Sequence, residues 1–505
     1  MLPSTSQNIQ FLLDGAVHVV PLLDPNVTVL TYLREHLGRR GTKEGCAEGD
    51  CGACTVVVAE PAADGLVYRP VNACIQFVAA LDARELFTVE SLSARDGALH
   101  PVQQAMVDFH GSQCGFCTPG IVMSLFALYK ANVPITRAAV DDCLAGNLCR
   151  CTGYRPIIDA ALAMRSDHKS KNDRDDVNDL PALRDTAQAE SVAADLRLLS
   201  ARAGPNIRFE GAGITGNQHV LDMPSHLQAA LTLLAQDPDA VVVAGGTDVG
   251  LRITKQHQDL KRIVHVGRIP ELRGIVVHAG VVDIGAATPI EDIYAAMRGT
   301  WPPLDELWRR FASPPIRHSA TLGGNIANGS PIGDSMPTLL ALNAQLLLAS
   351  SAGERLMPLA DFYTGYRKTA LARGELIKRI RIPTLGAAES FQVYKVSKRF
   401  DQDISAVCGA FCLTQRAGVI ETVRIAYGGM AATPMRARHC EIALTGSVIN
   451  AVPGADAIDA LARDFDPLSD ARASEQYRRL LARNLLRRFF NFLNGAARVD
   501  VLSDD

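Results

Sequence analysis

The sequence has no excess of charge of one sign and no long hydrophobic run. Its 51 Lys and Arg residues nearly balance 54 Asp and Glu residues, which leaves no strong field to attract nucleic acid or an anionic membrane. No apolar stretch reaches the roughly 18 residues of a membrane-spanning helix, and residues 1–10 lack a signal-sequence pattern. We therefore expect a cytoplasmic protein without nucleic-acid or membrane partners, in which cysteines bind metal rather than form disulfides.

Internal repeats and several common catalytic motifs are absent as well. The chain contains no H-E-x-x-H sequence, no nucleophile elbow and no Walker sequence, and its 12 histidines are scattered. Its 505 residues are too many for one hydrophobic core, so we expect three or four domains. The informative residues are the cysteines.

A first group of four cysteines has the spacing of ligands to an iron–sulfur cluster. Cys46, Cys51 and Cys54 run C-x4-C-x2-C, and Cys74 follows after a gap, which matches the plant-type [2Fe–2S] spacing. Glycines interleaved in Glu44–Cys54 (EGCAEGDCGAC) let the backbone turn tightly and aim N–H groups at the sulfurs. The alternative is structural zinc, which usually shows paired C-x2-C units.

A second group follows about forty residues later. Cys114 and Cys117 form a C-x2-C pair, and Cys149 and Cys151 form a C-x-C pair. The first pair precedes a helix that Pro119 opens, and the positive end of that helix favours thiolates and an anionic cluster. On spacing alone zinc also fits this group. Cys143 is a possible further ligand, but it falls within a helix pattern that favours the core. Cys408, Cys412 and Cys440 lie outside any ligand spacing, and the apolar run around Cys408 and Cys412 favours their burial.

Local patterns indicate how the chain is organised. Alternating apolar residues around Asp14-Gly15 predict a hairpin, and a helix capped by Asn26 and ended by Gly38 should follow. Further signals are a strand at Thr55–Ala59, a helix capped by Thr136 and a final helix at Tyr477–Leu493. Residues 166–204 are polar and charge-mixed, and nothing in them is expected to fill a core, so they predict a linker.

The segments Gln113–Leu125 (QCGFCTPGIVMSL) and Gly146–Ile157 (GNLCRCTGYRPI) resemble the xanthine dehydrogenase family of molybdenum hydroxylases. The resemblance covers nearly the whole chain and is greatest to the iron–sulfur and FAD subunit of that family. With the patterns above it implies an α+β multidomain fold. The expected parts are a β-grasp ferredoxin-like domain at 1–88, a helical-bundle iron–sulfur domain at 89–165, the linker at 166–204, an α+β FAD-binding domain at 205–385 and a C-terminal α/β flavoprotein domain at 386–505.

The resemblance also implies partners. In that family the second cluster lies nearest the molybdopterin, and Gln113 and Cys151 match positions that contact the pterin. They are therefore candidate relay residues at an interface with a molybdenum-binding large subunit, in a heterotetramer with two copies of each chain.

Two glycine-rich segments are candidates for the flavin. Val241–Gly250 (VVVAGGTDVG) and Thr321–Asp334 (TLGGNIANGSPIGD) let backbone amides approach a phosphate, although each alone fits an ordinary turn or loop equally well. Together they resemble the family's FAD-binding domain. The match implies that FAD contacts Val241, Val242, Val243, Ala244, Gly245, Gly246, Thr247, Asp248, Phe311, Thr321, Gly324, Asn325, Asp334, Ile377 and Lys395. Gly246 departs from the Asn that many relatives carry.

The same resemblance points to a region that faces NAD. Tyr366 and Arg367 match it, as does the loop Lys398–Ile404 (KRFDQDI) with Asp401 and Asp403. Arg367 and Arg399 fit ordinary surface or ion-pair roles equally well. Gly428–Met430 is either a lining of the NAD pocket or a simple turn.

The expected function is that of a xanthine dehydrogenase electron-transfer subunit. It would pass electrons from molybdenum in the partner through two [2Fe–2S] clusters to FAD and NAD during hypoxanthine or xanthine hydroxylation. Alternatives are a subunit of an aldehyde, CO or N-heterocycle hydroxylase, and a non-catalytic zinc-binding interaction protein.

Overall fold

The computed structural model describes residues 8–496 except 22, 64, 95, 132, 166–181, 183, 185, 203–205, 214–215 and 450–451. The chain divides into two compact units. The first comprises Met1–Ala230, Asp239–Ile269 and Ser313–Ala320, and the second comprises Leu231–Pro238, Pro270–Ala312 and Thr321–Asp505. Mixed α/β structure in several sheets confirms the predicted α+β multidomain fold.

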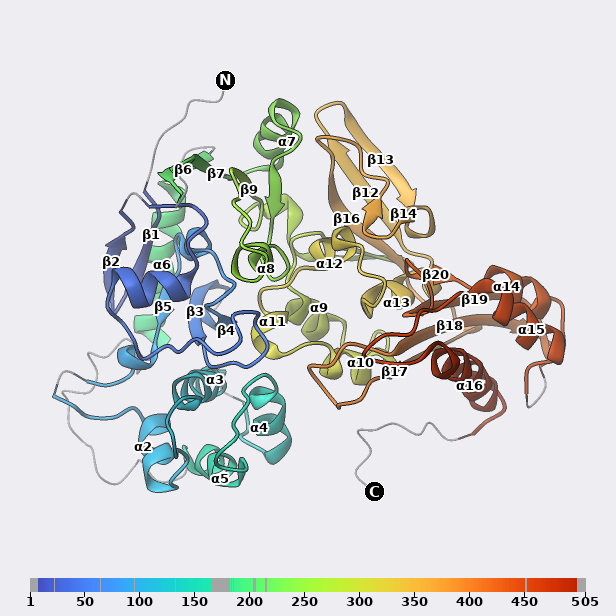
Figure 1. Cartoon of the computed structure of the whole chain (residues 1–505), viewed down its shortest axis with the longest axis horizontal. Coiled ribbons are helices and arrows are strands. Elements are labelled where there is room, and N and C mark those ends of the chain that lie inside the picture. Colours follow the sequence, from blue (N-terminus) through green and yellow to red (C-terminus); the bar gives the residue numbers. More distant parts are fainter. Residues whose placement is uncertain are drawn as a thin grey trace. The chain divides into compact units, whose positions relative to one another are not determined.

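The first unit begins with a five-stranded mixed sheet of order β2-β1-β5-β3-β4 (Figure 1). Its strands are β1 (Gln10–Leu13), β2 (Ala16–Val19), β3 (Thr55–Ala62), β4 (Gly65–Asn72) and β5 (Glu85–Phe87). The predicted hairpin is present: β1 and β2 pair around Asp14 and Gly15, whose φ angles of 52° and 79° suit a tight turn. Short helical segments complete this part: α1 (Val29–Thr31), η1 (Tyr32–His36), η2 (Val78–Leu81) and η3 (Val89–Ser91).

The predicted cap of this first helix, Asn26, was wrong. Thr28, not Asn26, accepts a hydrogen bond from the Thr31 N–H, at 3.2 Å. The Asn26 amide instead donates to Leu260 O and to Asp24, and it lies against His219. Asn is a good cap in general, but a partner 193 residues away leaves no trace in the local sequence.

Strand β3 is buried on both faces. Val56 and Val58 pack in one core with β6, β7 and β9, whereas Val57 and Ala59 pack in another with the helices that follow. Successive residues of a strand point to opposite faces, so a strand between two cores reads as a continuous apolar run.

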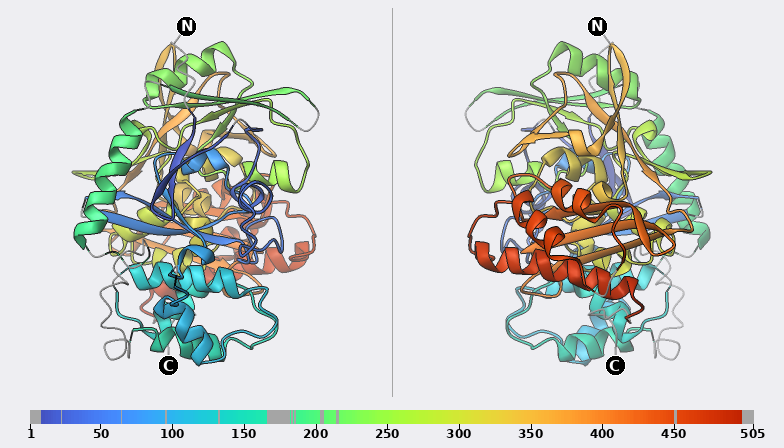
Figure 2. Two further views of the ribbon diagram at one scale, coloured as in Figure 1. Left: turned by 90° about the vertical axis from the view of Figure 1, so that its left-hand side faces the viewer. Right: turned by 90° about the vertical axis from the view of Figure 1, so that its right-hand side faces the viewer.

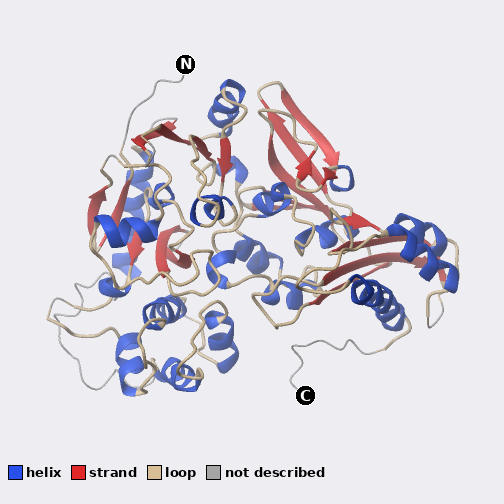
Figure 3. Ribbon diagram, viewed as in Figure 1, coloured by secondary structure: helices blue, strands red, loops and turns tan. Residues whose placement is uncertain are grey.

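Four helices follow, and the structure describes no strand between them (Figure 3). They are α2 (Pro101–Asp108), α3 (Thr118–Lys130), α4 (Arg137–Leu144) and α5 (Arg155–Ala163). Pro119 lies in the first turn of α3, and the Thr136 hydroxyl accepts from the Ala139 N–H at 3.2 Å, so both predicted helix starts are confirmed.

Part of the expected linker is a packed helix. Thr186–Ala201 forms α6, which packs on β3 and β4 and buries Ala193 and Leu196. This corrects the expectation that nothing in residues 166–204 packs, because a narrow apolar stripe can anchor a helix whose average composition is polar. The charge-rich stretch 166–179 lies outside the described residues.

The rest of the first unit is a four-stranded sheet of order β6-β7-β9-β8. Its elements are β6 (Asn206–Ala212), β7 (Gln218–Pro224), β8 (Val241–Val243), β9 (Arg262–His265), α8 (Val249–Thr254) and α11 (Pro314–Arg317). Helix α7 (Leu227–Gln236) follows β7 along the chain.

The second unit contains a five-stranded antiparallel sheet of order β10-β11-β16-β12-β13. The strands are β10 (Ile275–His278), β11 (Val281–Gly285), β12 (Gln345–Ser350), β13 (Gly353–Pro358) and β16 (Leu376–Pro383). Associated segments are η6 (Pro270–Leu272), α9 (Ile290–Met297), α10 (Leu304–Arg310), α12 (Leu322–Asn328), α13 (Ser335–Ala341), η7 (Leu359–Asp361), β14 (Tyr363–Gly365) and β15 (Lys368–Thr369).

A four-stranded sheet of order β17-β18-β19-β20 ends the second unit. It consists of β17 (Glu389–Val396), β18 (Val407–Arg416), β19 (Val419–Gly428) and β20 (Met435–Arg436), with α14 (Arg438–Leu444), α15 (Ala455–Asp464) and α16 (Glu475–Leu493). Helix α16 packs against β17 and β18 (Figure 2) and buries Phe489 and Phe490 in their core. Among the described residues, no helix is both long and apolar enough to cross a membrane.

Candidate iron–sulfur and flavin sites

The first cysteine loop wraps its backbone around one sulfur. Cys46 Sγ accepts hydrogen bonds from the N–H groups of Glu48, Asp50 and Cys51 at 3.4, 3.3 and 3.3 Å. The Cys46 N–H donates to Cys51 Sγ at 3.3 Å. Gly49, at φ 82°, lets the chain turn back within this loop. Such N–H donors to sulfur are one of the means by which a protein tunes a cluster.

The other two predicted ligands of this group meet the same place. Hydrogen bonds from the Cys51 and Cys74 thiols, and then from backbone N–H groups, lower the pKa of Cys46 well below its usual range. Cys54 in turn hydrogen-bonds Cys74, and both are buried. The Asn72 amide donates to Cys54 Sγ at 3.8 Å. Four sulfurs from the loop and from the end of β4 therefore converge in one largely buried cradle.

The second group converges at the N-terminal ends of α3 and α5. The Cys114 thiol lies near that of Cys151, and the Cys117 thiol lies near that of Cys149, close enough for the two thiols of each pair to affect each other's pKa. Burial, followed by the Cys149 hydrogen bond, raises the pKa of Cys117 to about 12. The Thr152 hydroxyl lies 3.1 Å from Cys149 Sγ. Neighbouring sulfurs from two helix starts thus form a second quartet.

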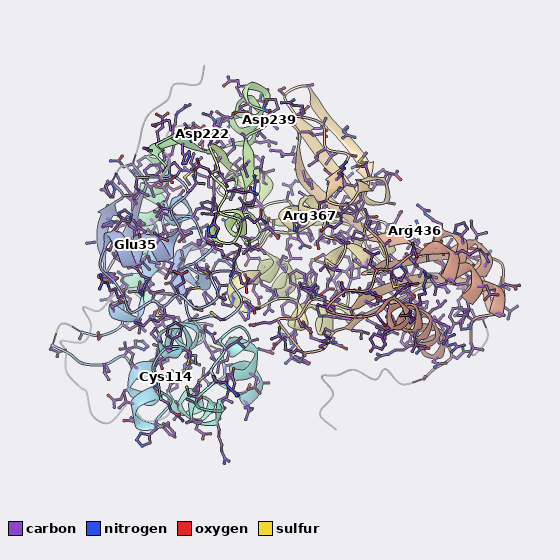
Figure 4. The ribbon with its side chains drawn as sticks, in the orientation of Figure 1. Glu35, Cys114, Asp222, Asp239, Arg367 and Arg436 are labelled. Atoms are coloured by element: carbon purple, nitrogen blue, oxygen red, sulfur yellow. The ribbon has the colours of Figure 1, made fainter. Side chains whose placement is uncertain are left out.

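The two quartets differ in exposure. Cys54 and Cys74 of the first are buried, whereas Cys114 and Cys151 of the second are exposed. Figure 4 marks Cys114 among the helices α2–α5. Gln113 is exposed beside Cys114. The second quartet is therefore the one that another molecule can reach.

The chemistry of both donor sets fits a binuclear cluster. All eight thiols are free. A [2Fe–2S] cluster takes two thiolates on each of two irons, so each set of four free thiols supplies a complete set of ligands.

The other four cysteines lie in packed surroundings. Cys408, Cys412 and Cys440 are buried, and Cys143 donates to Ser124 O at 3.1 Å. Burial raises the pKa of Cys143 to about 12, so its thiol stays protonated. None of them belongs to a quartet, as the spacing indicates.

The flavin candidates are divided between the two units. Residues 241–248 belong to the first unit and the remaining candidates to the second. In the first unit, β8 ends in a tight turn at Gly245 and Gly246. A Cβ on Gly245 would come 1.7 Å from Ser319 O, and Gly246 has φ 77°. Only glycine fits this turn without strain.

In the second unit, two flavin candidates form a buried ion pair. Lys395 Nζ lies 2.5 Å from Asp334 Oδ2 and donates to Asp403 O at 2.8 Å. The Ser405 hydroxyl donates to Asp334 Oδ1 at 2.6 Å. Ser405 was missed by the sequence reasoning, and no local signal marks it. The Lys395 charge is therefore fixed in position by Asp334 and the Asp403 carbonyl.

The helix α12 carries three more candidates. The Thr321 hydroxyl accepts from the Gly324 N–H at 3.2 Å and caps the helix. Asn325 Oδ1 is buried and has no hydrogen-bond partner among the described residues. A buried oxygen of this kind calls for a donor, and the hydroxyl groups of a ribose would supply one. Phe311 is half-buried at the end of α10, and Ile377 is buried on β16.

The candidate NAD residues lie on two loops of the second unit. Tyr366 and Arg367 are exposed at the turn between β14 and β15, where Arg367 has φ 52° and is labelled in Figure 4. Asp403 Oδ2 accepts the N–H groups of Lys398 and Arg399 at 2.8 and 2.9 Å. The Asp403 carboxylate therefore shapes its own loop.

Two buried arginines that the sequence reasoning missed hold this neighbourhood. Arg310 donates to Phe400 O, to Lys395 O and to Ser397 Oγ at 2.9, 3.1 and 3.1 Å. Arg478 donates to Ala406 O and Gly429 O at 2.5 and 2.9 Å. Gly429 has φ 82°, and Met430 is 2% exposed in the core. Segment 428–430 is therefore a turn whose backbone is held in place by the Arg478 side chain.

Domain families match most of the chain. Residues 14–78 match the family described as 2Fe-2S iron-sulfur cluster binding domain, and residues 88–162 match the [2Fe-2S] binding domain. Residues 218–385 match the FAD binding domain in molybdopterin dehydrogenase, and residues 392–493 match the CO dehydrogenase flavoprotein C-terminal domain.

Individual proteins are similar as well. The xanthine dehydrogenase of Emericella nidulans is 32% identical over 96% of this chain and 38% of its own length. The xanthine dehydrogenase/oxidase of Gallus gallus is 31% identical over 97% of this chain and 40% of its own length. The chain thus spans less than half the length of these relatives. A carbon monoxide dehydrogenase structure from Hydrogenophaga pseudoflava is 28% identical, with a TM-score of 0.49, over 53% of this chain and 94% of that chain.

Proposed function

Because this chain belongs to the molybdenum hydroxylase family, as the part with the iron–sulfur and FAD domains, we propose that it serves a xanthine dehydrogenase. It would pass electrons from a molybdenum site in a partner subunit to FAD and then to NAD while hypoxanthine or xanthine is hydroxylated. When bound, the clusters would carry single electrons and the flavin would collect two. The relatives with this activity are about one third identical to the chain, which supports the assignment.

The observation that carries the proposal is the pair of convergent, free-thiol quartets that differ in exposure. We propose that Cys46, Cys51, Cys54 and Cys74 hold one [2Fe–2S] cluster and that Cys114, Cys117, Cys149 and Cys151 hold the other. Exposed Cys114 and Cys151 support an entry point for electrons from a partner, with Gln113 beside it. The buried Cys54 and Cys74 suit an internal relay, because exclusion of water limits side reactions.

For FAD we propose contacts in each unit taken by itself: the backbone of 241–248 in the first unit, and the side chains around Asp334 and Lys395 in the second. The glycine turn at Gly245 and Gly246 supports a backbone contact, and the buried Asn325 oxygen, which has no partner among the described residues, supports a polar contact. Thr321, Gly324, Phe311 and Ile377 complete the proposed set.

For NAD we propose Tyr366, Arg367 and the loop with Asp401 and Asp403. Exposure of Tyr366 and Arg367 supports contact with a ligand, whereas the bonds of Asp403 to its own loop support a shaping role. Ordinary surface or ion-pair roles for Arg367 and Arg399 are the alternative to this assignment.

We propose domain boundaries at residues 88, 165, 204 and 385, with the C-terminal flavoprotein domain at 386–505. The matched ranges 88–162 and 218–385 support the first and the last. We further propose a heterotetramer of two such chains and two molybdenum-binding large subunits, in a reducing cytoplasm that keeps the thiols ready for iron.

One co-purification tests this function. The chain is isolated with whatever large subunit binds it, and iron, acid-labile sulfide, flavin and zinc are measured. Xanthine-dependent reduction of NAD is the expected activity. Activity with CO, an aldehyde or an N-heterocycle, and none with purines, would assign the chain to another hydroxylase. A colourless, zinc-loaded protein would refute the electron-transfer function.

A further inference from the structure

We propose that Asn147 is a positioning residue that fixes a hydrogen-bonded route for electrons between the two cysteine quartets. This inference rests on the proposed function, because it concerns how an electron would pass from one cluster site to the other. Asn147 itself is not a ligand.

The route is a single hydrogen bond between the two ligand segments. The Leu148 N–H donates to the Cys51 carbonyl oxygen at 3.0 Å. Cys51 belongs to the first quartet, and Leu148 immediately precedes Cys149 of the second. From Cys51 Sγ the path runs along the Cys51 backbone to its carbonyl, across the hydrogen bond to Leu148, and through one peptide unit to Cys149 Sγ. A bonded path of this kind couples two redox centres better than a gap of equal length.

The Leu148 side chain does not hold this contact in place, since it is 45% exposed. The preceding residue does. Asn147 is 3% exposed, and its amide nitrogen donates to Gly52 O at 3.2 Å and to Thr55 Oγ1 at 3.3 Å. Its amide oxygen accepts from the Ser124 hydroxyl at 2.7 Å. One side chain therefore ties the first cysteine loop and β3 to α3 and to the second cysteine segment.

Glycines let these backbones approach closely enough. A Cβ on Gly52 would come 2.0 Å from Gly146 O, and a Cβ on Gly120 would come 2.0 Å from Gly52 O. Gly52 also has φ 72°. The residues beside the ligands of both motifs therefore pack against one another: Gly52 next to Cys51, Gly120 in the first turn of α3, and Gly146-Asn147 before Cys149.

The role predicts an effect that simple destabilisation does not produce. Without the Asn147 amide, the Cys51 carbonyl and the Leu148 N–H lose their fixed register, so electron transfer between the sites should slow while each cluster stays bound. A purely structural role would lower stability and leave transfer unchanged in the folded molecules.

The test uses the full chain with both clusters, comparing Asn147→Ala with Thr136→Ala. Thr136 caps α4 in the same helical group, and losing a helix cap lowers stability. Reduced methyl viologen supplies electrons, which we expect to enter at the exposed second quartet. Freeze-quench EPR then follows each reduced cluster, and iron and sulfide analysis reports occupancy.

In Asn147→Ala we expect the first-quartet signal to lag behind the second by at least tenfold more than in the wild type, together with weaker magnetic coupling between the clusters. Thr136→Ala should match the wild type in both. A fully loaded Asn147→Ala protein with unchanged lag and coupling would overturn the inference.

A milder variant covers the case in which Asn147→Ala does not assemble. Ser124→Ala removes only the hydroxyl that orients the amide, and it should lengthen the lag at least twofold. No change in that variant would overturn the inference too. A wild-type protein without two binuclear iron clusters would instead refute the proposed function.

Discussion

Loss of the Lys395 charge should strongly destabilise the second unit. The Lys395 and Asp334 side chains are 2% and 6% exposed, so Lys395→Met leaves a buried carboxylate without its cation. Breaking a buried pair from one side typically costs about 3–5 kcal/mol. Because Ser405 still donates to the other Asp334 oxygen, we expect a cost near the lower end, about 3 kcal/mol.

The structure supplies comparisons of graded size. Ser405→Ala removes one hydrogen bond to a charged group and should cost about 1.5–3 kcal/mol. Lys378→Met breaks a more exposed pair with Glu354, whose side chains are 22% and 43% exposed, and should cost at most about 1 kcal/mol. In the double variant Lys395→Met/Asp334→Leu both charges are absent, so most of the loss should be recovered.

Tryptophan fluorescence is a suitable assay because the two tryptophans of the chain, Trp301 and Trp308, both lie in the second unit. Urea titrations of flavin-free protein would follow that unit alone. A cost below about 1 kcal/mol for Lys395→Met, or a double variant as unstable as the single one, would refute the reasoning.

Three further predictions follow from other sites. Cys117→Ser should remove about half of the bound iron and sulfide, since it deletes one ligand of one binuclear centre. The matched control Cys143→Ser should keep its full content of iron and sulfide. Equal iron loss in the two variants would contradict the assignment. Gly52→Ala should lower cluster content and thermal stability, because its Cβ would meet Gly146 O at 2.0 Å. Gly97 also has a positive φ but has nothing within 4 Å of a Cβ, so Gly97→Ala should lose only the smaller stability that backbone strain costs. Similar losses in both variants would argue against close backbone approach at Gly52. Burial, followed by the charges of Arg84 and Arg268, lowers the pKa of His265 to about 3. Between about pH 6.5 and 3 the unfolded chain therefore binds one more proton than the folded protein, and the free energy of unfolding falls by up to about 1.4 kcal/mol per pH unit as the pH drops. Circular dichroism melts of His265→Gln should show a smaller loss of stability in acid, and an unchanged slope would exclude this histidine as the cause.

Features set by neighbouring residues could be read from the sequence. The Asp14-Gly15 hairpin, the Pro119 helix and the Thr136 cap depend on local backbone preferences and short-range hydrogen bonds, so a few letters suffice. The spacing of the cysteines within each motif likewise identified the candidate ligands of each cluster from the sequence alone. The sheet-and-helix composition of the successive parts followed from the same local periodicities.

What the sequence alone determined, then, is the set of donors and the local turns that present them. Tertiary structure decided which distant groups meet. Asn26 contacts His219 instead of capping its helix, α6 packs where composition indicated a linker, and Ser405 and Lys395 hydrogen-bond Asp334. It also decided that Cys54 and Cys74 are buried while Cys114 and Cys151 are exposed, and that Leu148 touches Cys51. These outcomes depend on which surfaces are excluded from water when the whole chain packs, and no local pattern of residues encodes that.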